Sequence, residues 1–179
     1  MKTSLQSKSQ RPYGPINQNA FVVPDIDAAI DRWTRIRKVG PFFKFPPIVF
    51  EEADYRGRPQ VPDFEAAIAY SGELMIELIK PNGPSIFKEF LDAGHQGVHH
   101  FCAFTDDFEA ASSAIEREGG KRLQGGRFAD GSCLAYFDLG DPAPSILEIA
   151  YLMPPVLALF DAIKAAAASW NGHSRTVTF

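Results

Sequence analysis

Positions 97–107 carry the stretch GVHHFCAFTDD, whose pattern occurs twice in the chain and decides the fold. Its apolar run is typical of a strand, and the acidic pair at its end is typical of a cap that begins a helix. Two of the four histidines, His99 and His100, are neighbours in this strand. Adjacent strand residues point to opposite faces of a sheet, so we expect these two side chains to face different surroundings.

The earlier copy of the pattern is INQNAFVVPDIDAAI at positions 16–30. It predicts a short apolar strand, then Asp25 as an N-cap, then a helix whose apolar residues recur at helical spacing. When it is aligned on positions 98–112, Asn17 falls on His99, Gln18 on His100 and Asp25 on Asp107. Both copies therefore predict a strand, an acidic cap and a helix in the same order.

A second correspondence stands at the far end of each half. The apolar strands at 75–79 and 146–150 each carry a single glutamate at the middle, Glu77 and Glu148. The segments between helix and glutamate strand are β-like at 41–45 or 48–53 and at 64–70 in the first half, and at 121–128 and 132–139 in the second. The order strand, helix, strand, strand, strand thus appears twice, which indicates an internal duplication.

Composition bounds the class of protein. The chain has 179 residues, 45% of them hydrophobic and 22% charged, which is ordinary for a soluble globular domain. The net charge of −4 argues against nucleic acid as a partner, and no apolar run reaches the length of a membrane span. Residues 1–15 lack the apolar core of a signal peptide and predict a flexible lead-in to a cytoplasmic protein. The expected division is this lead-in, modules at 16–95 and 96–152, and a C-terminal helix and tail at 153–179.

The duplication pairs four polar residues in four apolar strands, Gln18 with His100 and Glu77 with Glu148. Taken singly, each has an ordinary explanation, as an edge-strand residue, a hydrogen-bonded core histidine or a solvated charge. If the halves are related by a pseudo-twofold axis, the four side chains converge on one point. An amide oxygen, an imidazole nitrogen and two carboxylates suit a divalent ion such as Zn, Co, Ni, Mn or Fe. By the same alignment we expect His99 to lie on the helix-covered side or at a rim.

These motifs resemble the vicinal oxygen chelate superfamily, and within it the glyoxalase-like branch of lactoylglutathione lyases and methylmalonyl-CoA epimerases, over roughly residues 16–152. The resemblance implies an α+β fold, in which two paired βαβββ modules form a cup-shaped mixed sheet with a divalent metal on its floor. It implies Gln18, Glu77, His100 and Glu148 as the metal ligands. It also implies Glu148 as a catalytic base and Glu77 as the group that handles the proton on the other side.

The chemistry expected from this resemblance is proton transfer next to a carbonyl, by a lyase or an isomerase that works as a homodimer on a small molecule. Glutathione-using relatives carry arginines at the positions of Val22 and Gln96, so a glutathione adduct is disfavoured as substrate. Aromatic residues in strands expected to wall the cup suggest an apolar or ring-containing substrate, and packing between strands explains them equally well; these are Phe42, Phe43, Tyr55 and Phe64.

Three other interpretations stay open. The chain could be a non-catalytic binder of hydrophobic small molecules with the same fold, or a regulatory or scaffold dimer. It could also be a ring-cleaving dioxygenase, although Gln18 stands where those enzymes have a histidine. The segment at 154–179 could cap the cup, join a dimer or form a tail.

Overall fold

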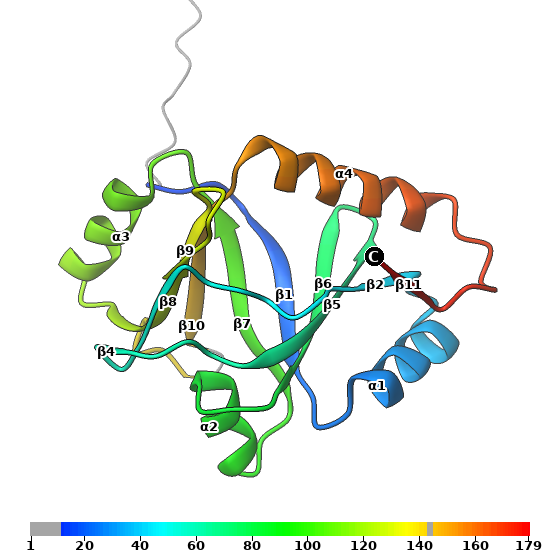
Figure 1. The fold of residues 1–179 in the computed structure, drawn as a ribbon, viewed down its shortest axis with the longest axis horizontal. Coiled ribbons are helices and arrows are strands. Elements are labelled where there is room, and N and C mark those ends of the chain that lie inside the picture. Colours follow the sequence, from blue (N-terminus) through cyan, green and yellow to red (C-terminus); the bar gives the residue numbers. More distant parts are fainter. Residues whose placement is uncertain (1–11, 143–144) are drawn as a thin grey trace, which may run out of the picture.

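A mixed eleven-stranded sheet curls around the centre of the molecule in this computed structural model, which describes residues 12–142 and 145–179 (Figure 1). The strand order is β11-β2-β5-β6-β1-β7-β10-β9-β8-β3-β4. The strands are β1 (Ile16–Val22), β2 (Phe42–Lys44), β3 (Glu52–Tyr55), β4 (Arg58–Pro59), β5 (Phe64–Ser71), β6 (Leu74–Pro81), β7 (Gly97–Phe104), β8 (Lys121–Arg127), β9 (Cys133–Asp138), β10 (Ile146–Tyr151) and β11 (Thr176–Thr178). The helices are α1 (Ile26–Arg32), which continues as the π-helical turn Trp33–Arg37, α2 (Ile86–Asp92), α3 (Phe108–Arg117) and α4 (Pro154–Ala168).

The duplicated order of elements is present in the sheet. The first half contributes the row β2-β5-β6-β1 and the second half the row β8-β9-β10-β7. In the first row β1 runs parallel to the glutamate-bearing strand β6, and in the second row β7 runs parallel to the glutamate-bearing strand β10. The two rows join where β1 pairs antiparallel with β7. Asp25 and Asp107 each cap a helix, because the side chain of each accepts a hydrogen bond from the backbone N–H three residues later in the chain. The predicted α+β fold is confirmed.

The two halves differ in the segment that follows β2. In the first half the chain leaves its own row after β2, and β3 pairs antiparallel with β8 of the second half. The alternative at 41–45 therefore corresponds to β2, whereas of the alternative at 48–53 only residues 52–53 are in a strand, the start of β3 at the other side of the sheet. The β3–β4 hairpin turns through Arg56 and Gly57, whose φ angles of 52° and 73° suit a two-residue turn with left-handed central residues.

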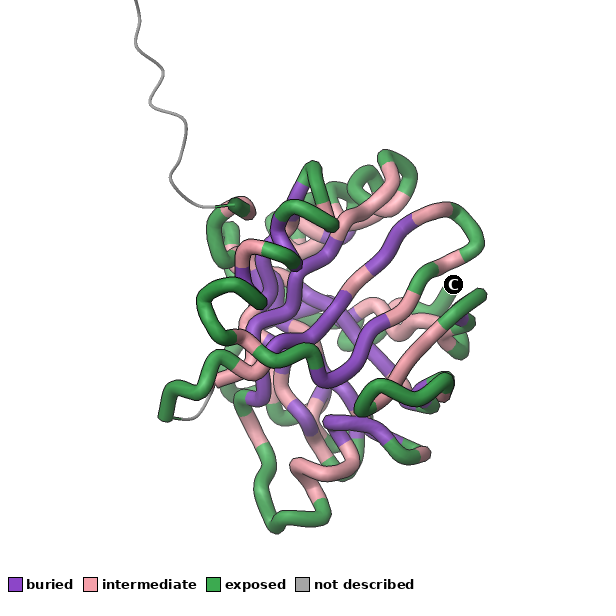
Figure 2. Tube along the Cα trace, turned by 90° about the vertical axis from the view of Figure 1, so that its left-hand side faces the viewer, coloured by how far each residue is buried: buried purple, intermediate pink, exposed green. Residues whose placement is uncertain are grey.

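The core has an outer and an inner part. Apolar side chains of α1 and α3 pack on the outer face of the sheet, where Ile30 and Ile115 are buried. A third cluster lies inside the curl and joins α2, through Phe87, to β1 and β9. The strands are the most continuously buried part of the chain, and the exposed residues gather in loops and on helix surfaces (Figure 2). This packing keeps the inner faces of the central strands away from water.

The C-terminal segment caps the sheet, the first of the three alternatives. Helix α4 lies across one end of the curled sheet, with Ile163 fully buried against it, and β11 then pairs with β2 (Figure 1). At the other end of the chain, residues 1–11 of the expected flexible lead-in lie outside the described residues. In the described part of this lead-in, residues 12–15, the Gly14 N–H donates a hydrogen bond to the Phe104 carbonyl at 2.8 Å. No helix in the described part of the chain has both the length and the apolar character needed to cross a membrane.

Candidate functional site

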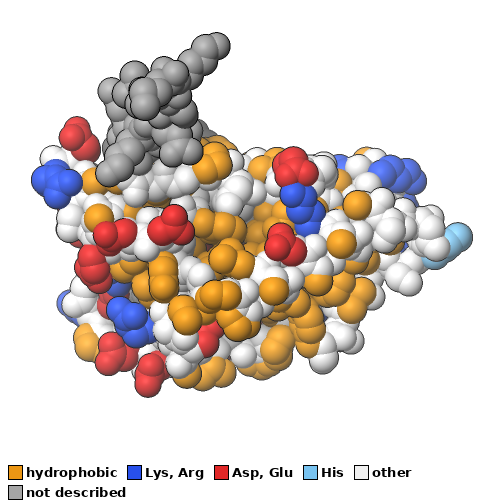
Figure 3. Space-filling model, turned by 90° about the horizontal axis from the view of Figure 1, so that it is seen from above, with side chains coloured by type: hydrophobic (Ala, Val, Ile, Leu, Met, Phe, Trp, Pro, Cys, Tyr) orange, Lys and Arg blue, Asp and Glu red, His pale blue; other side chains and the backbone are white. Residues whose placement is uncertain are grey.

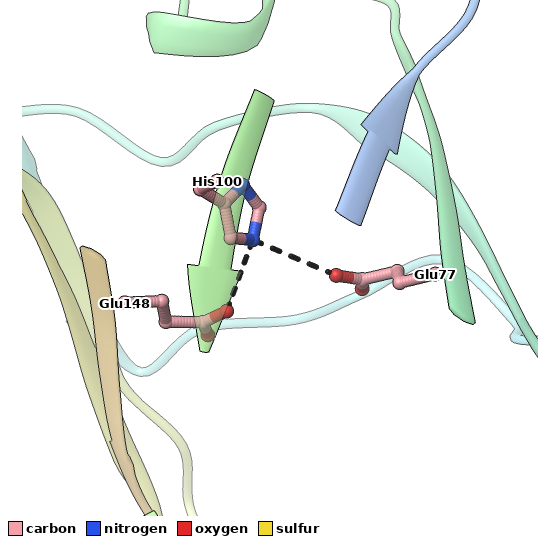
Figure 4. A group of neighbouring side chains, drawn as sticks. All are labelled: Glu77, His100 and Glu148. Carbon is pink, nitrogen blue, oxygen red and sulfur yellow. Dashed lines mark hydrogen bonds and ion pairs between the residues drawn. The ribbon is translucent and has the colours of Figure 1, made fainter. Parts of the chain in front are cut away.

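The four polar residues singled out by the duplication lie on four neighbouring strands at the centre of the sheet. Gln18 is on β1, Glu77 on β6, His100 on β7 and Glu148 on β10, all within one chain. One ligand atom from each of Glu77, His100 and Glu148 lies within 4.8 Å of the other two. Figure 4 shows the carboxylates of both glutamates directed at the same imidazole nitrogen.

Distances within this cluster are those of direct contact. His100 Nε2 is 3.1 Å from Glu148 Oε2 and 3.8 Å from Glu77 Oε2. The Gln18 Nε2 amide donates a hydrogen bond to Glu77 Oε2 at 2.6 Å. His100 is fully buried, and Gln18 and Glu148 are only 5% and 6% exposed. Two carboxylates therefore share one imidazole nitrogen in an interior site, with Gln18 attached to one of them.

The cluster is short of positive charge. Burial, followed by the charge of Glu148, raises the pKa of Glu77 well above its usual value, and the hydrogen bond from Gln18 opposes this rise. Burial and the nearby glutamates also raise the pKa values of Cys102 and Tyr136. Buried carboxylates are stable only when they are paired or coordinate a metal. Two carboxylates, an imidazole and an amide form a donor set that fits a divalent ion, with the amide presenting its oxygen.

The neighbouring histidines do not face opposite sides of the sheet, contrary to the expectation from strand alternation. Ala20 pairs with His100 while Phe21 pairs with Val98, so His99 is the extra residue of a β-bulge. The bulge brings the two rings together, with Nδ1 of one 2.9 Å from Nδ1 of the other.

The surroundings of His99 are helical, but the helix is α2, whose Phe87 also packs against His100. The His99 ring packs edge-on against Phe87 and Phe90 of α2. Burial, together with the neighbouring His100, lowers the pKa of His99 to about 3, although a hydrogen bond to the Ile86 backbone opposes this. His99 is therefore a neutral ring wedged between α2 and His100.

A cavity of about 340 Å³ opens above the cluster. Its floor includes Gln18, Glu77, Cys102 and Glu148, and Asp130 and Ser132 add polar groups to its lining. The remaining lining residues are apolar: Phe45, Ile48, Ala66, Ile68, Phe104, Phe128, Leu134, Ala150, Leu152, Val156 and Phe160. Seen from above, hydrophobic side chains gather over the middle of this face, with most charged side chains around them (Figure 3).

The aromatic wall of the cavity differs from the sequence-based expectation. Phe42, Phe43, Tyr55 and Phe64 do not line it. Phe42 instead packs edge-on near Trp33, and Phe64 packs against Phe87. Strand alternation alone could have identified Phe104, which shares a strand face with His100 and Cys102. The repeat predicts a helix after each glutamate strand, at 85–91 and 156–168, but nothing in the sequence pattern placed Phe160 of the second helix at the cavity.

A larger hollow of about 910 Å³ lies between the β3–β4 hairpin and the start of α3. It is open, and charged side chains of both signs line it, among them Asp54, Glu109 and Arg122. None of the four clustered residues borders it. The smaller cavity is therefore the candidate site, since it alone of the two reaches the buried carboxylates.

Comparison with known proteins agrees with this architecture. A family model described as the Glyoxalase/Bleomycin resistance protein/Dioxygenase superfamily matches residues 17–137, a span that contains Gln18, Glu77 and His100. No curated protein matches the chain.

Solved structures share the fold at low identity. A methylmalonyl-CoA epimerase from Mycobacterium tuberculosis is 15% identical with a TM-score of 0.58, over 86% of this chain and 97% of its own. A Streptomyces coelicolor methylmalonyl-CoA epimerase in complex with 2-nitronate-propionyl-CoA is 19% identical with a TM-score of 0.55, over 79% and 96%. A hypothetical protein from Bacillus halodurans is 17% identical with a TM-score of 0.56, over 78% and 94%.

Proposed function

The chain belongs to the glyoxalase/bleomycin resistance protein/dioxygenase superfamily, and from this premise we propose that it is a divalent-metal-dependent enzyme. The proposed reaction is proton transfer next to the carbonyl of a small apolar or ring-containing substrate, by an isomerase, epimerase or lyase. We further propose that the enzyme works as a homodimer in the cytoplasm.

The observation that carries this proposal is the buried cluster of Glu77, His100 and Glu148. No lysine or arginine stands among the described residues that line the cavity above it. Two carboxylates buried without a cationic partner cost several kcal/mol unless they are neutralised. A divalent ion held by these three residues and Gln18 would balance that charge, and Zn, Co, Ni, Mn and Fe all suit such a set.

The side chains divide the work in the proposed mechanism. A bound divalent ion supplies polarisation of the substrate carbonyl and stabilises the negative charge that develops on its oxygen. Glu148 takes the proton from the adjacent carbon at a carboxylate oxygen. Glu77 is the second carboxylate at the same imidazole, and we assign to it the proton at the other carbon or the other face, as an isomerase or epimerase requires (Figure 4). The epimerases of the same fold support this reaction class by analogy.

Metal analysis of the purified protein tests the proposal. We expect one divalent ion per chain, and we expect His100→Ala to lose it, because this change removes the imidazole donor. The same protein should catalyse exchange of solvent deuterium into carbonyl compounds, measured by proton NMR, and His100→Ala should abolish the exchange. Positioned carboxylates contribute about 10²–10⁴-fold to such transfers.

The control is His173→Ala, which removes an exposed histidine of the C-terminal segment. It should keep both metal and exchange. Absence of stoichiometric metal from the wild-type protein would contradict the proposal. So would a His100→Ala protein with unchanged metal content and exchange. A metal-free protein that still binds apolar molecules would instead fit the non-catalytic binder.

A further inference from the structure

We propose that the substrate is an uncharged, ring-bearing carbonyl compound that enters the cavity whole, rather than one carried on an anionic coenzyme or peptide. This inference rests on the proposed function, since it concerns the same site. The proposed substrate differs in this respect from the coenzyme A ligand named for the solved epimerase of the same fold. Three features of the cavity carry it, namely the charge at the floor, the nature of the wall and the size.

The charge at the floor balances without the substrate. Glu77 and Glu148 together bring two negative charges, Gln18 is neutral, and His100 would bind a metal as a neutral imidazole. A divalent ion therefore leaves no net positive charge at the floor to attract an anion. A neutral carbonyl or hydroxyl oxygen can still occupy a coordination position, because such ligands need no countercharge.

The wall offers nothing to an anionic group. Among the described lining residues there is no lysine, arginine or histidine, and the only charge beyond the floor is the carboxylate of Asp130. Phosphate and carboxylate groups are bound in proteins through charge-assisted hydrogen bonds, mostly from arginine and lysine. An anionic substituent here would lose its hydration, gain no such bond and lie in the field of Asp130. Four phenylalanine rings favour a planar hydrocarbon group instead; they are Phe45, Phe104, Phe128 and Phe160.

The volume limits how much of a substrate the cavity can enclose. About 340 Å³ lies near the small end of the roughly 300–1,000 Å³ range of ligand pockets. At about 30 Å³ for each water in the liquid, this cavity has room for about eleven water-sized groups. One aromatic ring with a short oxygenated side chain fills such a space. A nucleotide-bearing thioester would leave most of its atoms outside.

Helix α4 provides a place to test the charge rule away from the floor. Val156 lines the cavity, whereas its neighbour Leu157 does not line it and is 40% exposed. A lysine at either position adds the same charge to the same helix. Only Val156→Lys adds it to the cavity wall, so Leu157→Lys is the matched control.

Calorimetric titration of the metal-loaded protein compares two ligands of equal shape. One is hydroxymethyl para-tolyl ketone, and the other carries a carboxylate in place of the para-methyl group. In the wild-type protein we expect the neutral ketone to bind about tenfold or more tightly than the acid. Val156→Lys should reduce the ratio of the two dissociation constants by about tenfold, because it supplies the missing cation for the carboxylate. Leu157→Lys should leave the wild-type preference intact.

Three results would overturn the inference. The first is an acid that binds the wild-type protein as tightly as the neutral ketone, and the second is a neutral ketone that does not bind measurably. A preference for the neutral ketone that Leu157→Lys erases as fully as Val156→Lys would also contradict it, because the effect would then not come from the cavity. Metal content, measured on the same samples, reports separately on the proposed function.

Discussion

His99 and His100 show how one extra residue changes the roles of its neighbours. The bulge in β7 brings their Nδ1 atoms to 2.9 Å, so one of the two rings must donate to the other. If Nε2 of His100 holds a metal, its proton lies on Nδ1, and His99 accepts that proton in a hydrogen bond. Partners of this kind fix the tautomer and the orientation of a ligating histidine.

The prediction at this scale is that His99→Leu weakens metal binding by about 10–100-fold. Leucine suits the surroundings formed by Phe87 and Phe90 but cannot accept the hydrogen bond. His99→Asn should retain most of the affinity, because its side-chain oxygen can accept from His100. Competition with a chromophoric chelator measures the dissociation constants, and circular dichroism checks that both variants fold. Equal affinities for wild-type and His99→Leu proteins would disprove this role.

The ligand candidates could be predicted from the sequence, but their neighbours could not. Glu77 and Glu148 stand out because each is a lone charge in an apolar strand that recurs in the repeat. The bulge at His99 depends on how β1 and β7 pair, and no local pattern encodes that register. The repeat therefore singled out His100, and strand alternation misjudged the direction of His99.

Among the elements, the β3–β4 hairpin is the part that breaks the symmetry of the two halves. It pairs with β8 and is tied to α2 at its turn, where Tyr55 and Arg56 both donate to the carboxylate of Glu89. The hydrogen bond from Arg56 is the main reason that the pKa of Glu89 lies below its usual value. A lowered pKa means that the ionised carboxylate stabilises the fold above about pH 4.3, the unfolded value, and that this contribution is lost as the pH falls further.

We expect Glu89→Gln to lower the free energy of unfolding at pH 7 by no more than about 1 kcal/mol, since the contact is partly exposed. The difference from wild type should shrink below about pH 4, where the wild-type carboxylate takes up its proton. Urea unfolding at several pH values measures it. Trypsin should also cut faster after Arg56 in this variant.

The control for that prediction is Asp92→Asn, which removes the ion pair with Lys88 on the same helix and leaves the hairpin tie in place. It should not change the rate of cleavage at Arg56. Equal cleavage of the wild-type and Glu89→Gln proteins would show that the contact with Glu89 does not hold the hairpin.

Secondary structure was more predictable than the assignment of elements to partners. The spacing of apolar residues located β1, β7 and the two glutamate strands, and Asp25 and Asp107 marked the helix starts. Whether segment 41–45 or 48–53 belonged to the first row could not be decided from composition. Residues 42–44 form β2 in that row, whereas β3 begins only at Glu52 and pairs with β8 of the other half. The position of α4 over the cavity likewise depends on packing, because α2, which follows the other glutamate strand, packs into the inner cluster instead.

For the molecule as a whole, the donors of the candidate metal site are divided equally between the halves. Gln18 and Glu77 belong to the first half, and His100 and Glu148 to the second. A bound ion would therefore link the two halves as well as neutralise the cluster. It would stabilise the folded chain by mass action, because the unfolded chain cannot assemble the site.

We predict that removal of the metal lowers the melting temperature. At a free metal concentration of about one hundred times Kd, metal binding stabilises the folded chain by about 2.7 kcal/mol. For a domain of this size that corresponds to a melting temperature higher by about 5–11 °C. Differential scanning calorimetry with and without a chelator measures the shift, and His100→Ala should show none. A metal-loaded wild-type protein that melts at the same temperature after chelation would contradict the prediction.

The antiparallel junction of β1 and β7 also has a kinetic consequence. Each half can form its own strands and helix through contacts within its row, whereas the four donors meet only after the two rows have docked. During refolding in the presence of Co²⁺, the visible absorption of the bound ion would therefore appear later than the far-ultraviolet signal of secondary structure. The interval between the two signals would time the docking of one half of the duplication against the other.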